Sequence, residues 1–259
     1  MNSKIFNPML KNKVAIVTGG SGHIGNEIIK ALNTCGVKVL NLDVKKSQLN
    51  LGKNFHFEYC DISKKKELEK SINLCIKKFK KIDILINNAS FVGDSKLRGW
   101  NVPFEKQDEE IWEDILSVNL TSSFTLSKMV WPFFKKNKNG VIVNISSIYG
   151  FLAPNTSLYK GIKSLNNPAA YSASKGGIIQ LTRWLSTNMA PFTRVNALAI
   201  GGIKRNQPEK FIKRYQDLTP LKRMASENDI VGPLLFLISD LSKYITGQVI
   251  NVDGGWSAW

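Results

Sequence analysis

The chain has 259 residues, of which 43% are hydrophobic, enough to bury one large core. Its formal net charge is +16, yet the lysines are scattered over predicted outer helix faces and no nucleic-acid-binding module is recognisable. No run reaches the roughly 20 apolar residues of a membrane span, and the N-terminal residues lack a signal-peptide pattern, so we expect a cytoplasmic protein with no nucleic-acid or membrane partner.

Strand-like runs alternate with amphipathic helical stretches along the chain. Short apolar runs predict strands at 13–18, 37–42, 55–60, 82–86, 141–146, 194–199 and 248–252. Helical spacing predicts helices at 25–35, 64–81, 109–136, 170–190 and 227–237. This alternation predicts an α/β fold, a doubly wound, mostly parallel seven-stranded sheet with helices on both faces. Because no repeat or linker interrupts it, we expect one domain over residues 1–259.

The cysteines and histidines do not indicate a disulfide framework or a metal site. Cys35, Cys60 and Cys75 are odd in number and form no C-x-x-C pair, while His23 and His56 are far apart. We therefore expect buried free thiols and no metal.

A glycine-rich segment follows the first predicted strand and opens the first predicted helix. Its glycines, at positions 20, 22 and 25, satisfy G-x-G-x-x-G. Glycine permits a tight turn and close approach of the backbone to a pyrophosphate, and a helix N-terminus offers free N–H groups to the phosphates. The segment predicts a dinucleotide site, with contacts from Gly19, Ser21, His23 and Ile24.

Asp43 closes the second predicted strand, 18 positions after Gly25. An acidic side chain near this spacing accepts hydrogen bonds from the adenine ribose hydroxyls and repels a 2′-phosphate. The residue therefore favours NAD over NADP. Lys45 and Lys46 follow closely and weaken this interpretation, and an ordinary turn-forming aspartate is the alternative.

Tyr171 and Lys175 stand four positions apart in a predicted helix, so their side chains share a face. A cation there lowers the pKa of the phenol from its usual value of about 10, which suits a group that gives or takes a proton. Asp61, Asn88 and Ser147 end or follow predicted strands, at the edge where open parallel sheets bind ligands.

Taken in order, these motifs resemble the short-chain dehydrogenase/reductase family, from Lys13 to Trp259. The resemblance implies a Rossmann-type fold, NAD(P)-dependent chemistry on CH–OH groups, and a homotetramer or homodimer. It rests on the glycine turn, Asp61-Ile62, Asn87-Asn88-Ala89, Asn119, Asn144-Ile145-Ser146-Ser147, Tyr171 to Lys175, Arg194-Val195-Asn196 and Val252-Asp253-Gly254-Gly255.

The resemblance also implies four catalytic roles. Tyr171 is the acid/base, and Ser147 holds the substrate oxygen. Lys175 grips the nicotinamide ribose and tunes Tyr171, while Asn119 supports a water that relays protons to Lys175.

The same resemblance implies further contacts with the cofactor. Asp61 and Ile62 flank the adenine, Asn88 contacts the adenine-side ribose, and Ile203 contacts the carboxamide. The sequence departs from the family pattern at His23, which stands where the second glycine of the usual turn is expected. It also departs at Ile200, which replaces the usual proline after the sixth strand.

An insertion separates the two main catalytic residues, since Tyr171 follows Ser147 by 24 positions. The inserted loop, residues 153–167, is expected to hang over the active site beside a substrate-lid region at 201–226. Within the family these segments look like oxidoreductases of bacterial surface-sugar and flagellin-modification pathways. This implies interconversion of a secondary alcohol and a ketone on a small, anionic or neutral molecule: a sugar, sugar phosphate or nucleotide sugar.

Polar residues of these segments are candidate substrate contacts, with a solvated or packing role as the alternative for each. They are Tyr149, Tyr159, Lys160, Lys204, Arg205 and Arg214, beside Ser147 and Tyr171. Two other functions stay open. The glycine pattern also fits sugar-nucleotide epimerases or dehydratases, which usually carry a larger C-terminal region. A non-catalytic NAD-binding sensor would be expected to have lost the Tyr or Lys.

Overall fold

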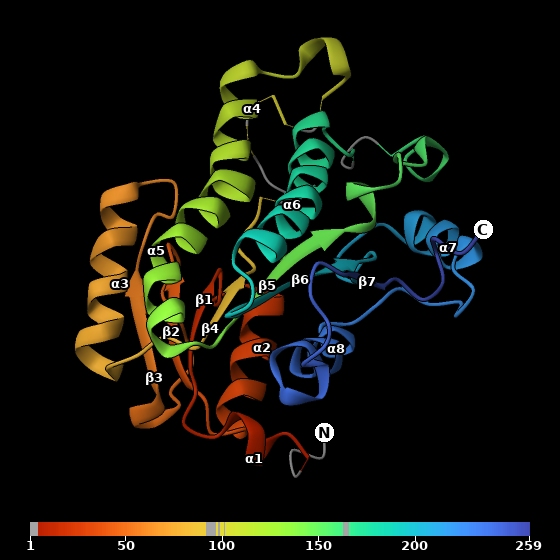
Figure 1. The fold of residues 1–259 in the computed structure, drawn as a ribbon. Helices are drawn as coiled ribbons and strands as arrows, with labels where there is room; N and C mark the ends of the chain where they lie inside the picture. Colours follow the sequence, from red (N-terminus) through yellow and green to blue (C-terminus); the bar gives the residue numbers. More distant parts are fainter. Residues whose placement is uncertain (1–4, 92–96, 98, 101, 163–165) are drawn as a thin grey trace.

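Seven parallel strands form one sheet in the order β3-β2-β1-β4-β5-β6-β7 (Figure 1). The computed structural model describes all residues except 1–4, 92–96, 98, 101 and 163–165. The predicted doubly wound parallel sheet is confirmed. In chain order the strands are β1 Val14–Thr18, β2 Lys38–Asp43, β3 Phe55–Tyr59, β4 Ile84–Asn87, β5 Gly140–Ser147, β6 Thr193–Ile200 and β7 Val249–Val252.

Helices cover both faces of this sheet. Apolar side chains of α2 and α8 pack on one face, while α3, α5 and α6 pack on the other. The helices are α1 Asn7–Leu10, α2 His23–Thr34, α3 Lys65–Phe79, α4 Glu109–Leu116, α5 Ser122–Asn137, α6 Ala169–Asn188, α7 Glu209–Leu218 and α8 Asn228–Ile238.

The central strand β1 shows why these runs are apolar at every position. Val14 and Ile16 point into the core beneath α3 and α5, whereas Ala15 and Val17 point into the core beneath α2 and α8. Successive side chains of a strand face opposite sides, so a strand covered on both faces has no polar alternation. The three cysteines are free and buried, as expected.

Two helical segments differ from the sequence predictions. The helix expected over residues 109–136 is interrupted by a π-helical turn, Ser117–Thr121, between α4 and α5. The helix α7 was not predicted, because charged residues dominate it. Its buried Phe211 and Tyr215 are four positions apart, a spacing that would have revealed one apolar face.

The carboxyl ends of β1, β4, β5 and β6 lie at one edge of the sheet, where Ser147 pairs with Ile200. The insertion crosses this edge through a short 3₁₀ turn, Thr156–Leu158, and packs against α7. Residues 163–165 of the predicted 153–167 loop lie outside the described residues.

Candidate active site

The glycine turn after β1 is closed so tightly that side chains are excluded from it. Gly19 has φ +65°, and a Cβ atom there would lie 2.7 Å from the Cα atom of Ala89. A Cβ atom on Gly25 would collide with the carbonyl oxygen of Gly19. The helix α2 begins at His23 with no side chain capping its first turn. Its N–H groups can therefore receive an anion, as a dinucleotide phosphate site requires.

The carboxylate of Asp43 lies beside this turn. Its Oδ2 atom accepts a hydrogen bond of 2.8 Å from the N–H of Ser21, and its Oδ1 atom accepts one of 2.9 Å from the N–H of Lys45. These bonds hold the carboxylate at the end of β2 and fix its position relative to the turn. His23 is exposed and Ile24 half-buried at the start of α2.

Asn88 braces the turn from β4. Its Nδ2 atom donates to the carbonyl oxygens of Thr18 at 2.9 Å and Gly19 at 3.0 Å. The hydroxyl of Thr18 accepts from the N–H groups of Asn88 and Ala89, both at 3.0 Å. The end of β4 and the glycine turn are thus one hydrogen-bonded unit.

The remaining predicted cofactor contacts are distributed along the same edge. Asp61 accepts two hydrogen bonds from Ser63 and forms an ion pair of 3.2 Å with Lys64. Ile62 is buried against the core. Ile203 is also buried and forms a bridge with Ala225.

Ser147 and Tyr171 meet where β5 ends and α6 begins. Ser147 is 5% exposed, and its side chain lies close enough to the half-buried Tyr171 to lower the pKa of the phenol. Lys175 lies one turn further along α6 and is 3% exposed. Its Nζ atom donates to the carbonyl oxygen of Ile145 at 2.9 Å and lies 5.7 Å from the centre of the Tyr171 ring. The residues predicted to be catalytic are therefore brought together.

The pKa of Tyr171 departs from the sequence prediction. Burial raises this pKa, against the lowering effects of the Ser147 hydrogen bond and the Arg205 charge. Burial also lowers the pKa of Lys175 to about 8. The expected lowering of the Tyr171 pKa is therefore wrong, because desolvation of the phenol outweighs the lowering effects.

Asn119 lies in the π-helical turn and is 2% exposed. Its Oδ1 atom accepts from the N–H of Phe91 at 2.8 Å, and its Nδ2 atom donates to the Ser174 hydroxyl at 3.2 Å. Ser174 in turn donates to the carbonyl oxygen of Tyr171 at 2.8 Å. The amide therefore joins the segment after β4 to the turn of α6 that carries Tyr171.

Aromatic side chains cover the other side of this edge. The hydroxyls of Tyr149 and Tyr159 are 3.2 Å apart. Tyr159 continues into a ladder of rings, which we call the aromatic ladder: its neighbouring ring centres are 5.6, 6.0 and 4.3 Å apart. The ladder joins the insertion to α7 and to the C-terminal segment. Its members are Tyr159, Phe211, Tyr215 and Trp256.

Hydrogen bonds of Arg214 and Tyr215 hold α7 against the insertion and against the segment that follows β6. The Nη1 atom of Arg214 donates to the carbonyl oxygens of Leu158 at 3.0 Å and Lys160 at 2.7 Å. The hydroxyl of Tyr215 accepts from the N–H of Gly202 at 2.6 Å. Sequence reasoning predicted Arg214 as a substrate contact. It named Tyr215 only as part of the family resemblance, without a role, because its role depends on contacts distant in the chain.

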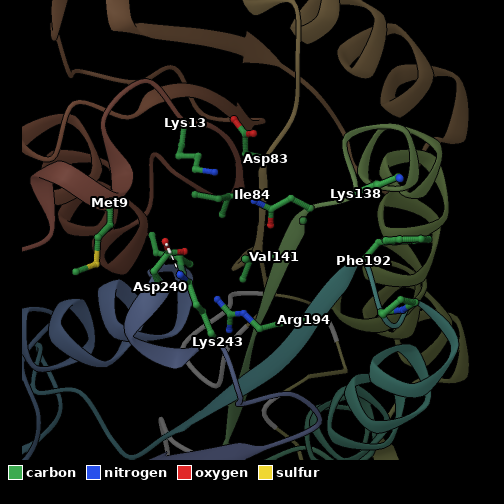
Figure 2. Close-up of a pocket in the computed structure, with 14 residues that line it drawn as sticks. Met9, Lys13, Asp83, Ile84, Lys138, Val141, Phe192, Arg194, Asp240 and Lys243 are labelled. Carbon is green, nitrogen blue, oxygen red and sulfur yellow. Dashed lines mark ion pairs between the residues drawn. The ribbon is translucent and has the colours of Figure 1, made fainter.

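A hollow of about 360 Å³ lies at the opposite edge of the sheet, where β1, β4, β5 and β6 begin (Figure 2). Its acidic groups are paired: Asp83 with Lys81 at 2.9 Å, and Asp240 with Lys243 at 3.3 Å. None of the predicted catalytic residues lines it. Among the described residues no group of His, Cys, Asp and Glu side chains could hold a metal ion, and no helix is long and apolar enough to cross a membrane.

Comparison with known proteins agrees with this geometry. The family model described as enoyl-(acyl carrier protein) reductase matches residues 21–257. The chain belongs to the short-chain dehydrogenase/reductase family and is a dehydrogenase or reductase acting on CH–OH groups.

Three relatives illustrate the range of the family around this chain. Post-translational flagellin modification protein A of Campylobacter coli is 36% identical, with 96% of this chain and 99% of that protein covered. A probable galactose dehydrogenase of Rhizobium meliloti is 33% identical, with 96% of each covered. A short-chain dehydrogenase of Leptospira borgpetersenii, solved with bound NAD+, is 34% identical with a TM-score of 0.89, covering 97% of this chain and 95% of that one.

Proposed function

We propose that the chain is an NAD-dependent oxidoreductase that interconverts a secondary alcohol and a ketone on a sugar-like substrate. The observation that carries this proposal is the proximity of Ser147 and Tyr171 at the carboxyl edge of the sheet, with the buried amine of Lys175 one turn away. A hydroxyl acid/base beside a second hydroxyl suits the transfer of a proton to or from an alcohol oxygen.

Each catalytic side chain has one task in this proposal. Ser147 binds the substrate oxygen, and Tyr171 gives or takes the proton on that oxygen. Lys175 binds the nicotinamide ribose and supplies positive charge near the phenol when protonated. Asn119 fixes the turn of α6 through Ser174 and supports the proton path to Lys175.

The residues around the glycine turn fit a dinucleotide. The positions of Gly19 and Gly25 have no room for a Cβ atom, and the N–H groups that open α2 lack a side-chain cap. Bound there, NAD supplies the group that accepts or donates the hydride. The cofactor contacts we assign, beside Tyr171 and Lys175, are Gly19, Ser21, His23, Ile24, Asp43, Asp61, Ile62, Asn88 and Ile203.

Asp43 supports the choice of NAD rather than NADP. Its carboxylate is held at the turn by Ser21, where a 2′-phosphate would meet a negative charge. We expect NADH to bind at least about tenfold more tightly than NADPH, the ratio of a 1.4 kcal/mol difference. Fluorescence titration of both cofactors measures this, and tighter binding of NADPH would contradict the role of Asp43.

Two observations support the proposed substrate class: the names of similar proteins, and the tyrosine hydroxyls beside the active site. A flagellin modification protein and a probable galactose dehydrogenase are among the similar proteins. The paired hydroxyls of Tyr149 and Tyr159 can hydrogen-bond to a polyol. We therefore propose a sugar, sugar phosphate or nucleotide sugar, handled in the cytoplasm during the synthesis of a surface glycan.

Replacement of Tyr171 by Phe tests the mechanism. Without the phenol oxygen we expect turnover to fall by about 10²- to 10⁴-fold while NADH affinity stays unchanged. Oxidation of a panel of free, phosphorylated and nucleotide-linked sugars is followed by NADH absorbance. Net NADH formation separates a dehydrogenase from an epimerase, which recycles its cofactor. Tyr244→Phe is the matched control, because Tyr244 is fully exposed. Full turnover by Tyr171→Phe would refute the acid/base assignment.

Assembly into a homotetramer or homodimer is part of the proposal. Large apolar side chains are exposed on α4, α5 and α6, at Trp112 (38%), Phe124 (44%) and Trp184 (54%). Side chains of this kind are enriched at protein interfaces. Light scattering of the purified chain measures the number of copies.

A further inference from the structure

Arg205 occupies a rigid position on the catalytic edge of the sheet. It follows the last residue of β6 by five positions. Its N–H donates to the side chain of Gln207 at 2.6 Å, and the preceding Lys204 donates its N–H to the carbonyl oxygen of Ala225 at 2.8 Å. The backbone is therefore held on both sides, and the guanidinium extends from a fixed base.

The guanidinium of Arg205 has weak pairing in the structure. Its Nε atom lies 3.5 Å from Glu227 Oε1, beyond good hydrogen-bond geometry, and this buried nitrogen has no hydrogen-bond partner among the described residues. By contrast, Arg223 forms two bonds to Asp229 at 2.7 and 2.8 Å, and Arg214 bonds to two carbonyls. A partly buried guanidinium with so little compensation is suited to a ligand that completes its hydrogen bonds.

The charge of Arg205 is one of the influences on the pKa of Tyr171. It lowers the pKa of Tyr171, whereas Lys204 is an exposed surface residue. Tyr159, which pairs with Tyr149, also influences the pKa of Tyr171. Arg205 follows β6 at the carboxyl edge of the sheet, the same edge where Ser147 ends β5 and where the proposed substrate would bind.

We infer that Arg205 is the specificity-determining residue of the substrate site and binds an anionic group, a carboxylate or a phosphate, carried by the sugar. A guanidinium presents a planar fork of N–H donors that matches both groups. This inference rests on the proposed function and narrows its substrate class to acidic or phosphorylated sugars.

The diphosphate of the cofactor is also an anion that a guanidinium could bind, but its proposed binding site lies at a different part of the edge. Its cradle is the turn between β1 and α2, and β6 is the third strand from β1 in the sheet. Three strand spacings of about 4.8 Å separate the ends of these strands by about 14 Å. The position of Arg205 after β6 therefore favours the substrate as the source of the anion.

Phosphate binding tests the inference without requiring turnover. Inorganic phosphate is titrated calorimetrically into the full chain saturated with NAD+, as wild type, Arg205→Gln and Lys204→Gln. We expect Lys204→Gln to bind phosphate like the wild type and Arg205→Gln to bind it at least about tenfold more weakly, as for the loss of a charge-assisted hydrogen bond. Failure of the wild type to bind phosphate would overturn the inference. So would unchanged binding by Arg205→Gln, which assigns the anion to another basic region such as the hollow of Figure 2.

A second titration separates the two sources of the anion. NADH fluorescence is expected to give the same affinity for the wild type and Arg205→Gln. A tenfold loss of NADH affinity in that variant would assign the guanidinium to the cofactor diphosphate and overturn its role toward the substrate. Failure of either titration leaves the Tyr171→Phe experiment unaffected, so the inference and the proposed function fail independently.

Discussion

The two sides of the active-site edge are built in different ways. On the side of β1 and α2, backbone atoms, glycines and short polar side chains form the turn, and the positions of Gly19 and Gly25 have no room for a Cβ atom. On the side of the insertion and α7, bulky rings from three separate segments form the aromatic ladder. The shape of the first side depends on glycines, which lack a side chain. The shape of the second side depends on large aromatic side chains that pack against one another.

This difference separates the binding of the cofactor, which members of the family share, from the selection of the substrate, which differs between them. A dinucleotide phosphate is recognised by N–H groups, which every residue supplies once the backbone is correctly bent. A substrate is selected by side chains, which can change without altering the sheet. Variants on each side should therefore fail differently: the first in cofactor affinity, the second in the order of the cover and in substrate selection.

The largest effect is expected for Gly25→Ala. The added Cβ atom would collide with the carbonyl oxygen of Gly19 and lie 2.5 Å from the Cα atom of Gly20, so the turn must open. Overpacking of this kind costs about 1–3 kcal/mol, which predicts NADH binding about 10- to 100-fold weaker in fluorescence titrations. Lys30→Ala is the control, because Lys30 is exposed on the same helix, away from the turn. Unchanged NADH affinity in Gly25→Ala would contradict the conclusion that the tight glycine turn determines cofactor binding.

The second effect concerns Lys175, whose burial lowers its pKa to about 8 from a usual value of 10.5. Burying the charge costs about 3 kcal/mol at neutral pH. Loss of the bond to Ile145 in Lys175→Met offsets about 1 kcal/mol of this, so we expect the cofactor-free variant to be about 2 kcal/mol more stable but inactive. Denaturant unfolding measures the difference, with the exposed Lys128→Met as control.

The sign of the pH dependence follows from the direction of this shift. Below about pH 8 the lysine is protonated in both the folded and unfolded chain, so the full cost is present. Between about pH 8 and 10 the folded chain releases its proton first, and the stability of the wild type rises toward that of Lys175→Met. A difference that does not change over this range would show that the amine is not desolvated.

The smallest effect is expected for Arg214→Gln. This variant loses the two charge-assisted bonds to Leu158 and Lys160, and because the group is partly exposed we expect a local loss of about 1 kcal/mol. Hydrogen exchange of the insertion should become about fivefold faster, while NADH affinity stays unchanged. Lys213→Gln is the control, since Lys213 is exposed on the same helix. A change in NADH affinity instead would show that the two sides are coupled.

Features that depend on local sequence patterns could be predicted from the sequence: the strands, the residues at their ends and the glycine turn. Apolar runs and turn residues specified the seven strands to within a few residues, because strands buried on both faces require continuous apolar side chains. Ser147 was predicted at the carboxyl edge, since parallel strands all end there, and the family resemblance placed the helical Tyr171 beside it. The glycine turn was predictable because its glycines form a short local motif, although the bonds that brace it come from Asn88 and Ala89 after β4.

Features that depend on contacts between residues distant in the chain could not be predicted from these patterns. Nothing in the spacing distinguishes Arg205, with its weakly paired guanidinium, from Arg214, which is bonded to the insertion. The raised pKa of Tyr171 required knowledge of its burial. The π-helical turn was also missed, because a single irregular turn leaves the helical spacing on either side intact.

That irregular turn makes the number of residues between α4 and α5 part of the chemistry. Removing one residue from Ser117–Thr121 would let the helix regain regular α-helical periodicity, because a π-helical turn holds one residue more than an α-helical turn. Loss of the wider turn would shift the backbone at Asn119 and take its amide away from Phe91 and Ser174. A deletion that a surface loop would tolerate is therefore equivalent, at this point of the chain, to the loss of an active-site amide.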